Sequence, residues 1–297
     1  MMKYMLEENK KHGDAQFPVS LYTVTHTVEY GPVLPCHWHE EYEILYIRRG
    51  NALLRIGDHT YTAAEGDFFF INGGELHSAF SENPGGCCYD AVVFSLSFLN
   101  SSSNDACQQR YISRFMLKQY QLPHRLEDGN ALKVQLQALI GILLDKLEKK
   151  NPGYELFLKG ILLMILSLLA EESLLTEKQP ARGDLAGTYK KGHTEKMKKV
   201  LDYISENYMQ RIQLDELAAL ADMNRYNFCR FFKKHTDMTP VEYLNLHRVN
   251  EAFRLLQSAD CTVTDAALQA GFESMSYFSR MFKRFKNVSP SQVRTSR

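Results

Sequence analysis

The spacing of hydrophobic residues changes near residue 100 of the chain. Between residues 17 and 100, short apolar runs rich in β-branched and aromatic residues alternate with turn sequences such as RGN, AAEGD and NGGE. Runs of this kind predict strands, and they include YEILYI (42–47), ALLRI (52–56), TYT (60–62), DFFFI (67–71) and YDAVVFSL (89–96). Many short strands at this spacing predict a β-barrel or a β-sandwich.

A helical period replaces this pattern between residues 101 and 176. Residues 131–149 are predicted to form an amphipathic helix, because leucine and isoleucine recur at intervals of three and four. The sequence NPG (151–153) interrupts the pattern, and a second apolar helix is predicted at about 154–173. One apolar stripe is expected to pack on the barrel and another on a second copy of the chain. The next stretch, with one proline, three glycines and mixed charge, predicts a linker at 177–193.

The last hundred residues contain an internal repeat. Five residues of the first copy recur 50 positions later: Phe228, Arg230, Phe232, Lys233 and Pro240 return as Phe278, Arg280, Phe282, Lys283 and Pro290. Each copy predicts a helix, a tight turn and a second helix, at about 214–236 and about 263–286. A repeated helix-turn-helix with arginine at the same exposed position of both second helices favours DNA binding over a plain helical hairpin.

The segment between the two copies predicts one long helix. Thr239, Pro240 and Glu242 have the spacing of a helix start, with a capping threonine and a glutamate three residues later. A helix that runs to about Ser258 is roughly 30 Å long, close to the ~34 Å between successive major grooves on one side of DNA. Both second helices are therefore expected to enter DNA from the same side.

Charge supports this interpretation only weakly. Residues 194–297 contain 16 Lys and Arg against 12 Asp and Glu, whereas residues 1–193 contain 19 against 23. A basic half is typical of contact with nucleic acid but is also common on solvated surfaces. The exposed positions expected to contact DNA are Arg225, Tyr226, Cys229, Arg230, Lys233, Met275, Ser276, Ser279, Arg280 and Lys283.

Residues 197–294 resemble the DNA-binding domain of the AraC/XylS transcription regulators. The resemblance covers both helix-turn-helix units and is most specific in GFESMSYFSRMFKRFKNVSPSQVR. It implies that the first exposed positions of each second helix contact bases. Lys233 and Lys283 lie a turn further on, so they are expected to contact phosphates or solvent. Asn224 and Cys229 depart from the usual residues of the family, so the bases read by the first unit stay open.

Histidines mark a second candidate site in the strand-rich region. His37, His39 and Glu43, followed by His77, match the first and second motifs of the cupins, although Asn72 and Ser81 depart from the second motif. If 37–43 is one strand, positions i, i+2 and i+6 share a face, so the three side chains point inward together. Three histidines and one glutamate suit Zn, Ni, Fe or Mn.

Three interpretations of this cluster remain. AraC-type regulators carry a cupin-like domain that binds a small effector, often a sugar, so His37, His39, Glu43 and His77 are expected to bind an effector with or without a divalent metal. No cofactor is required in the version without metal. A structural role at the barrel mouth is the third interpretation.

We therefore predict an α+β multidomain protein and not an enzyme. The predicted parts are an arm (1–16), a cupin-like barrel (17–100), a helical dimerisation region (101–176), the linker (177–193) and an all-α DNA-binding domain with two helix-turn-helix motifs (194–297). The expected partners are a double-stranded DNA operator, a small-molecule effector, a second copy in a homodimer and, for an activator, RNA polymerase. The alternatives are a metal-dependent cupin enzyme fused to a DNA-binding domain, and a constitutive DNA-binding dimer whose barrel senses nothing.

The remaining composition predicts a cytoplasmic location. The six cysteines form no regular framework and no apolar signal segment precedes them, which favours free thiols. The longest apolar run, at 160–170, is about half the length of a membrane span.

Overall fold

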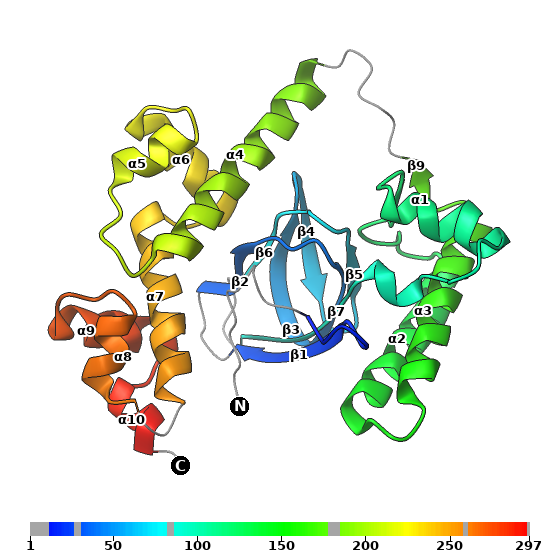
Figure 1. Cartoon of the computed structure of the whole chain (residues 1–297), viewed down its shortest axis with the longest axis horizontal. Coiled ribbons are helices and arrows are strands. Elements are labelled where there is room, and N and C mark those ends of the chain that lie inside the picture. The colour runs from blue at the N-terminus through cyan, green and yellow to red at the C-terminus, as the bar shows by residue number, and fades with distance from the viewer. Residues whose placement is uncertain (1–11, 27–30, 82–85, 178–184, 258–260, 296–297) are drawn as a thin grey trace. The chain divides into compact units, whose positions relative to one another are not determined.

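The computed structural model describes residues 12–26, 31–81, 86–177, 185–257 and 261–295. The chain forms two compact units, which divide at Leu185 and Ala186, except that Pro35–His37 are grouped with the second unit. The first unit contains the strands and the helices up to α3, and the second contains the helices from α4 onward (Figure 1). The helices of the described residues are too short or too polar to cross a membrane.

Seven strands form the curled sheet of the N-terminal unit. Five of them lie in the order β1-β7-β3-β6-β2, and β4 and β5 also pair with β3. Their bounds are β1 (Val19–His26), β2 (Gly31–His37), β3 (Tyr42–Ile56), β4 (His59–Ala64), β5 (Phe68–Ile71), β6 (His77–Ser81) and β7 (Cys87–Phe94). The cupin-like β architecture expected from the sequence is confirmed as a curled half-barrel.

Strand β3 holds the curl together because it belongs to both halves of the sheet. Its first half pairs with β5 and β7, and its second half pairs with β4 and β6. The register with β7 shifts between Ile47 and Arg49, which bends the strand. Gly50 follows with a φ of +79°, and a side chain there would meet the carbonyl oxygen of Gly86 at 2.3 Å. The bend therefore separates the predicted runs 42–47 and 52–56, which form one strand of 15 residues.

Helices cover one face of this sheet. The predicted helix at 131–149 is confirmed as α2 (Ala131–Lys149), capped by Asn130, and the second as α3 (Tyr154–Glu171). Their leucines and isoleucines share a core with Ile44, Phe68 and Val92 of the sheet. The unit also contains η1 (Leu96–Leu99), the π-helical turn η2 (Gln108–Ile112), α1 (Ser113–Met116) and the short pair β8 (Tyr120–Gln121) and β9 (Thr176–Glu177).

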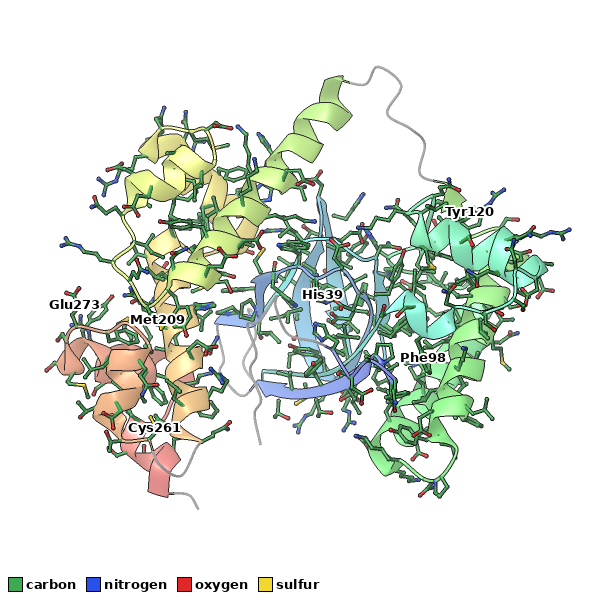
Figure 2. All side chains as sticks on the ribbon, in the orientation of Figure 1. His39, Phe98, Tyr120, Met209, Cys261 and Glu273 are labelled. Atoms are coloured by element: carbon green, nitrogen blue, oxygen red, sulfur yellow. The ribbon has the colours of Figure 1, made fainter. Side chains whose placement is uncertain are left out.

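The C-terminal unit is entirely helical. Its elements are α4 (Leu185–Asn207), α5 (Leu214–Leu220), α6 (Arg225–Thr236), α7 (Pro240–Leu256), α8 (Val263–Gln269), α9 (Met275–Lys286) and α10 (Pro290–Thr295). The predicted helix start is confirmed, because Thr239 and Glu242 form a capping box, and Thr262 and Asp265 form a second one at the start of α8. Figure 2 shows the side chains of both units, including Met209, Cys261 and Glu273 in this one.

Two predicted boundaries differ from the structure. Helix α4 begins at Leu185, so residues 185–193 of the predicted linker are helical. Glycine content suggested a linker there, but isolated glycines in a long helix cost only about 1 kcal/mol each relative to alanine. The long connecting helix, α7, has 17 residues rather than about 20, which makes it about 25 Å long. The predicted arm falls largely outside the described residues, which begin at residue 12.

Candidate functional site

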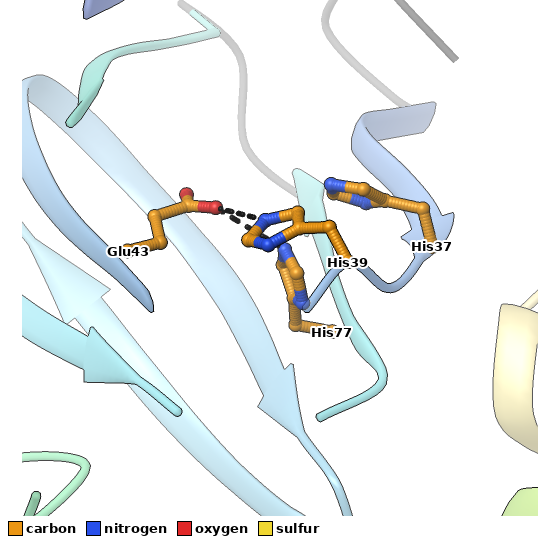
Figure 3. A group of neighbouring side chains, drawn as sticks. All are labelled: His37, His39, Glu43 and His77. Carbon is orange, nitrogen blue, oxygen red and sulfur yellow. Dashed lines mark hydrogen bonds and ion pairs between the residues drawn. The ribbon is translucent and has the colours of Figure 1, made fainter. Parts of the chain in front are cut away.

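Four predicted side chains come together beside strand β3. Glu43 lies on β3, His77 begins β6, and His37 ends β2, while His39 lies in the connection between β2 and β3 (Figure 3). The expectation that His37, His39 and Glu43 share one strand is therefore wrong. The chain turns between His37 and Tyr42, and this turn brings the residues together. Their ligand atoms all lie within 4.8 Å of one another.

Glu43 is at the centre of the cluster and is almost completely buried. One carboxylate oxygen lies 3.0 Å from His39 Nε2 and 3.3 Å from His77 Nε2. The neighbours of Glu43 across the sheet are Ile71 on β5 and Val93 on β7, both fully buried. Glu43 is thus flanked by a buried apolar residue on each neighbouring strand.

The outer nitrogen of each imidazole is held by the backbone. Nδ1 of His37, His39 and His77 lies 2.9–3.0 Å from the carbonyl oxygens of Pro35, Glu41 and Glu75, respectively. A carbonyl oxygen only accepts hydrogen bonds, so Nδ1 must carry the proton in each ring. In a neutral ring this leaves the lone pair on Nε2, which for His39 and His77 faces the carboxylate of Glu43. Lone pairs on both sides repel unless protons or a cation lie between them.

The charges of the cluster stabilise one another. Burial favours the neutral acid and raises the pKa of Glu43, but the hydrogen bonds and charges of His39 and His77 outweigh it, so the pKa lies well below its ordinary value. Burial lowers the pKa of His39, but the hydrogen bond and charge of Glu43, helped by Glu41, raise it above its ordinary value overall. The site therefore favours a carboxylate facing positive charge, which protonated imidazoles or a bound cation supply.

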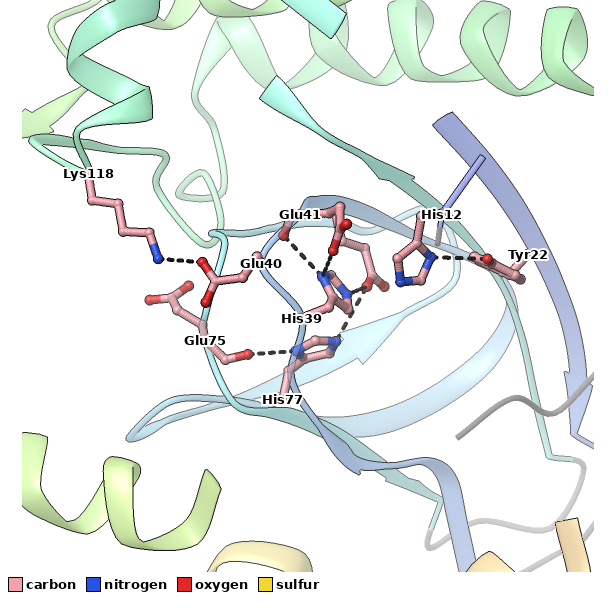
Figure 4. A network of polar contacts seen from close by, with 9 residues as sticks. His12, Tyr22, His39, Glu40, Glu41, Glu75, His77 and Lys118 are labelled. Atoms are coloured by element: carbon pink, nitrogen blue, oxygen red, sulfur yellow. Dashed lines mark hydrogen bonds and ion pairs between the residues drawn. The ribbon is translucent and has the colours of Figure 1, made fainter. Parts of the chain in front are cut away.

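An outer layer of contacts positions His77 (Figure 4). Glu75 accepts from His77 through its backbone, while its carboxylate accepts from the backbone and side chain of Asn72 and contacts His124 at 3.0 Å. Asn72 also bonds Leu122 in both directions, at 2.7 Å and 3.1 Å. Asn72 stands where the cupin motif has proline. Its side chain fixes the chain at Leu122, a contact that proline cannot make.

His12 is a candidate that the sequence pattern did not reveal. Its ring lies 5.1 Å from the ring of His39, its Nδ1 lies 3.0 Å from the hydroxyl of Tyr22, and it forms a second possible ligand group with His39 and Glu41. No spacing rule connects residue 12 to residue 39, and only the fold brings them together. The last residues of the predicted arm therefore reach the cluster.

The predicted DNA-contacting residues lie on the outer faces of α6 and α9. Asn224 and Ser274 cap these helices. Phe228 and Phe278 have fully buried side chains that pack each helix into the core. Cys229 is half-buried, and the other predicted side chains are exposed: Arg225, Tyr226, Arg230, Lys233, Met275, Ser276, Ser279, Arg280 and Lys283.

A tyrosine supports the arginine on each of these helices. The guanidinium of Arg230 lies 5.8 Å from the ring centre of Tyr226, and that of Arg280 lies 5.2 Å from the ring centre of Tyr277. Stacking on a ring restricts a long side chain before it meets DNA. Tyr277 was missed as a site residue, although its position three residues before Arg280 is a signal that the sequence contains.

Two family models match the chain. Residues 28–166 match the AraC-like ligand binding domain, and residues 217–296 match a helix-turn-helix domain. The chain belongs to the AraC family of transcription regulators. It is therefore a DNA-binding regulator with a ligand-binding domain, and its similarity is to regulators rather than to enzymes.

Similar proteins cover almost the whole regulator. The uncharacterized HTH-type transcriptional regulator YdeC of Bacillus subtilis is 27% identical over 98% of this chain and 97% of its own. The transcriptional activator RhaS of Klebsiella pneumoniae is 25% identical over 89% of this chain and 88% of its own. Among solved structures, ToxT of Vibrio cholerae is 17% identical, covers 96% of this chain and 100% of its own, and has a TM-score of 0.45.

Proposed function

We propose that the cluster of His37, His39, Glu43 and His77 is the sensor site of this regulator, and that it binds a divalent cation together with a small polar effector. The observation that carries the proposal is the orientation of the rings. Backbone carbonyls hold the Nδ1 protons of the histidines, so the Nε2 lone pairs of His39 and His77 point at the buried carboxylate of Glu43.

The donor set fits Zn, Ni, Fe or Mn. Imidazole nitrogen and carboxylate oxygen are ordinary ligands of these ions, and an Nδ1 proton donated to a carbonyl is the usual support of a metal-bound histidine. When bound, the cation supplies positive charge between the lone pairs and open positions for hydroxyl or carboxylate groups of an effector. Sugar as that effector remains a prediction.

Regulation requires that the occupied site favour one state of the regulator over another. A ligand that binds two states equally shifts neither. The contact between the rings of His12 and His39 is one feature that can differ between the two states. An occupant bound to Nε2 of His39 changes the surroundings of His12. Deletion of residues 1–16, which removes His12, should therefore change how the effector alters DNA affinity, and an unchanged response would contradict a role for the arm.

Metal content tests the site directly. The chain purified without an affinity tag should carry near-stoichiometric metal, and the His39→Ala/His77→Ala variant should carry none, as measured by plasma mass spectrometry. His59→Ala, which removes an exposed histidine of the same unit, should keep the metal. The absence of metal from all three proteins would contradict the proposal that the cluster binds a cation. The cluster would then be tested as a hydrogen-bonding pocket by thermal shift with a panel of sugars.

The functional readout is DNA affinity. A duplex selected from a random library by the metal-loaded chain should lose affinity when the metal is chelated, and the His39→Ala/His77→Ala variant should not respond to chelation. An equal affinity with and without metal would show that the cation does not regulate DNA binding.

We also infer that the regulator is a homodimer that pairs through α3. Four exposed apolar side chains repeat every seven residues along this helix: Leu156 with Leu163, and Phe157 with Met164. A seven-residue repeat is the pattern of paired helices. Leu156→Lys/Leu163→Lys should yield monomers in analytical ultracentrifugation, and a wild-type chain that sediments as a monomer would refute the inference. Contact with RNA polymerase remains a prediction.

A further inference from the structure

The second helix of each helix-turn-helix unit, α6 or α9, is here called the recognition helix. Each recognition helix has a hollow along one side, and the two hollows occupy equivalent positions. We propose that both seat the sugar-phosphate backbone of DNA and that the first, between α4 and α6, makes the stronger phosphate contact. The inference rests on DNA binding by the helix-turn-helix units and adds a contact surface outside their base-reading positions.

The equivalence follows the internal repeat. The first hollow has a volume of about 740 Å³ and the second about 560 Å³. Four residues of α6 line the first, and the residues 50 positions later on α9 line the second: Asn227, Arg230, Phe231 and Lys234, then Tyr277, Arg280, Met281 and Arg284. A preceding helix forms the other wall, α4 in the first and the start of α7 in the second. Two copies of one feature at matching positions indicate a common role.

Helix geometry places each hollow where a backbone passes. Successive residues of an α-helix are turned by about 100°. Tyr226 and Lys233 are seven residues apart and so mark nearly the same outward direction, while Asn227 and Lys234 are turned about 100° from it. A recognition helix in the major groove points one face at the bases and turns its sides toward the two backbones. The hollow therefore faces a backbone, with Arg230 at the border of the two faces.

The charge of the first hollow suits phosphate. Lys196 of α4 joins Arg230 and Lys234 of α6, and the ring of Phe231 forms a floor 5.3 Å from the ring of His193. The carboxylate among these lining residues is Asp222, which lies 3.3 Å from Lys196 and is 80% exposed. Three cations against one exposed carboxylate leave the surface positive.

The second hollow is less positive than the first, because two arginines among its lining residues face one glutamate. Arg284 lies 3.0 Å from Glu242, and Arg280 lies against the ring of Tyr277. Glu242 is also held by Thr239 in the capping box of α7, which fixes it beside the arginine. A phosphate at this hollow meets an arginine whose charge is already partly neutralised. The two repeats therefore differ in how much of the electrostatic attraction each contributes.

Lys234 and Arg284 occupy the same position in the two repeats and so form a matched pair. The full chain is titrated onto a fluorescein-labelled duplex of arbitrary sequence over a series of KCl concentrations, with fluorescence anisotropy as the readout. Each lost phosphate contact lowers the steepness of log K against log salt by about 0.9. Lys196→Ala and Lys234→Ala should each lose about that much, and Arg284→Ala should lose clearly less. Lys149→Ala, an exposed lysine of the other unit, should not change the slope.

The outcomes separate the inference from DNA binding itself. Unchanged slopes for Lys196→Ala and Lys234→Ala, with wild-type chain that still binds, would overturn the phosphate seat. Equal losses for Lys234→Ala and Arg284→Ala would overturn the difference between repeats. A wild-type chain that fails to bind at low salt would instead refute DNA binding. The last experiment is a thermal shift measurement with inorganic phosphate. If phosphate stabilised the wild-type chain but not Lys234→Ala, and the salt slopes stayed unchanged, the hollow would bind a small anion and the DNA contact would be overturned.

Discussion

Gly271 occupies the turn of the second helix-turn-helix, and replacing it with alanine should destabilise the C-terminal unit strongly. Its φ of +80° costs an alanine about 1–2 kcal/mol. The new methyl carbon would also lie 2.7 Å from the carbonyl oxygen of Tyr208 and 2.8 Å from two backbone atoms of Met209. Overpacking of this kind costs about 1–3 kcal/mol.

The loop that Gly271 touches is held in place. Arg248 on α7 donates from Nε to the carbonyl of Tyr208 and from Nη2 to that of Gln210, both at 2.7 Å. Because the loop is fixed, the two costs should add to about 2–5 kcal/mol. For a unit of about 100 residues this lowers the melting temperature by roughly 10 °C or more.

Calorimetry of the full chain measures the effect, since added duplex DNA raises the melting temperature of the DNA-binding unit and so identifies its transition. Gly129→Ala is the matched control. Its φ is +89°, but a side chain there meets nothing within 4 Å, so it should show the backbone cost alone, about 1–2 kcal/mol. If Gly271→Ala destabilised its unit no more than Gly129→Ala destabilises the other, the close approach of the Tyr208 loop would be refuted.

Three further predictions concern single side chains. Arg280→Ala should cost about 1–3 kcal/mol at a selected operator and little on other sequences if Arg280 reads a base; equal losses in both binding titrations would make it a phosphate contact. Burial, aided by the charge of Arg248, lowers the pKa of His247 to about 4. As the pH falls from about 7 to about 5, this imidazole becomes protonated in the unfolded chain but stays neutral in the folded chain. The C-terminal unit should therefore lose about 2 kcal/mol of stability over this range. His247→Gln should remove most of this loss in melts at the two pH values, and an unchanged loss would contradict the assignment. Asn72→Leu leaves the buried N–H and C=O of Leu122 unpaired, so the N-terminal unit should lose at least about 2 kcal/mol in urea unfolding, and a smaller loss would show that water replaces the side chain.

Local patterns in the sequence predicted local structure well. The period of the leucines in 131–149 predicted both ends of α2 correctly, and Thr239 marked the start of α7 because its cap depends on a residue only three positions away. The internal repeat located both helix-turn-helix units, because each unit is formed by residues that are close together in the sequence. The capping box formed by Gln213 and Glu216 was not anticipated, since glutamine is a rare cap.

Features that depend on distant residues were harder to predict. The four side chains predicted to converge around Glu43 do lie together, but a turn, not a shared strand face, brings them together. Nothing in the local sequence indicated that His12 reaches His39 or that α4 forms a wall beside α6. Such contacts depend on how strands and helices pack, which spacing rules do not describe.

Strand β3 also has a mechanical consequence. Side chains alternate along it, so Glu43 points into the curl while its neighbours Tyr42 and Ile44 belong to the core shared with α2 and α3. Tyr42 further contacts the ring of Phe115 on α1. The thickness of one strand is thus all that separates the cluster around Glu43, the proposed sensor site, from the helical layer. A displacement of Glu43 by a bound molecule would be transmitted through consecutive peptide units to the surface on which the helices rest.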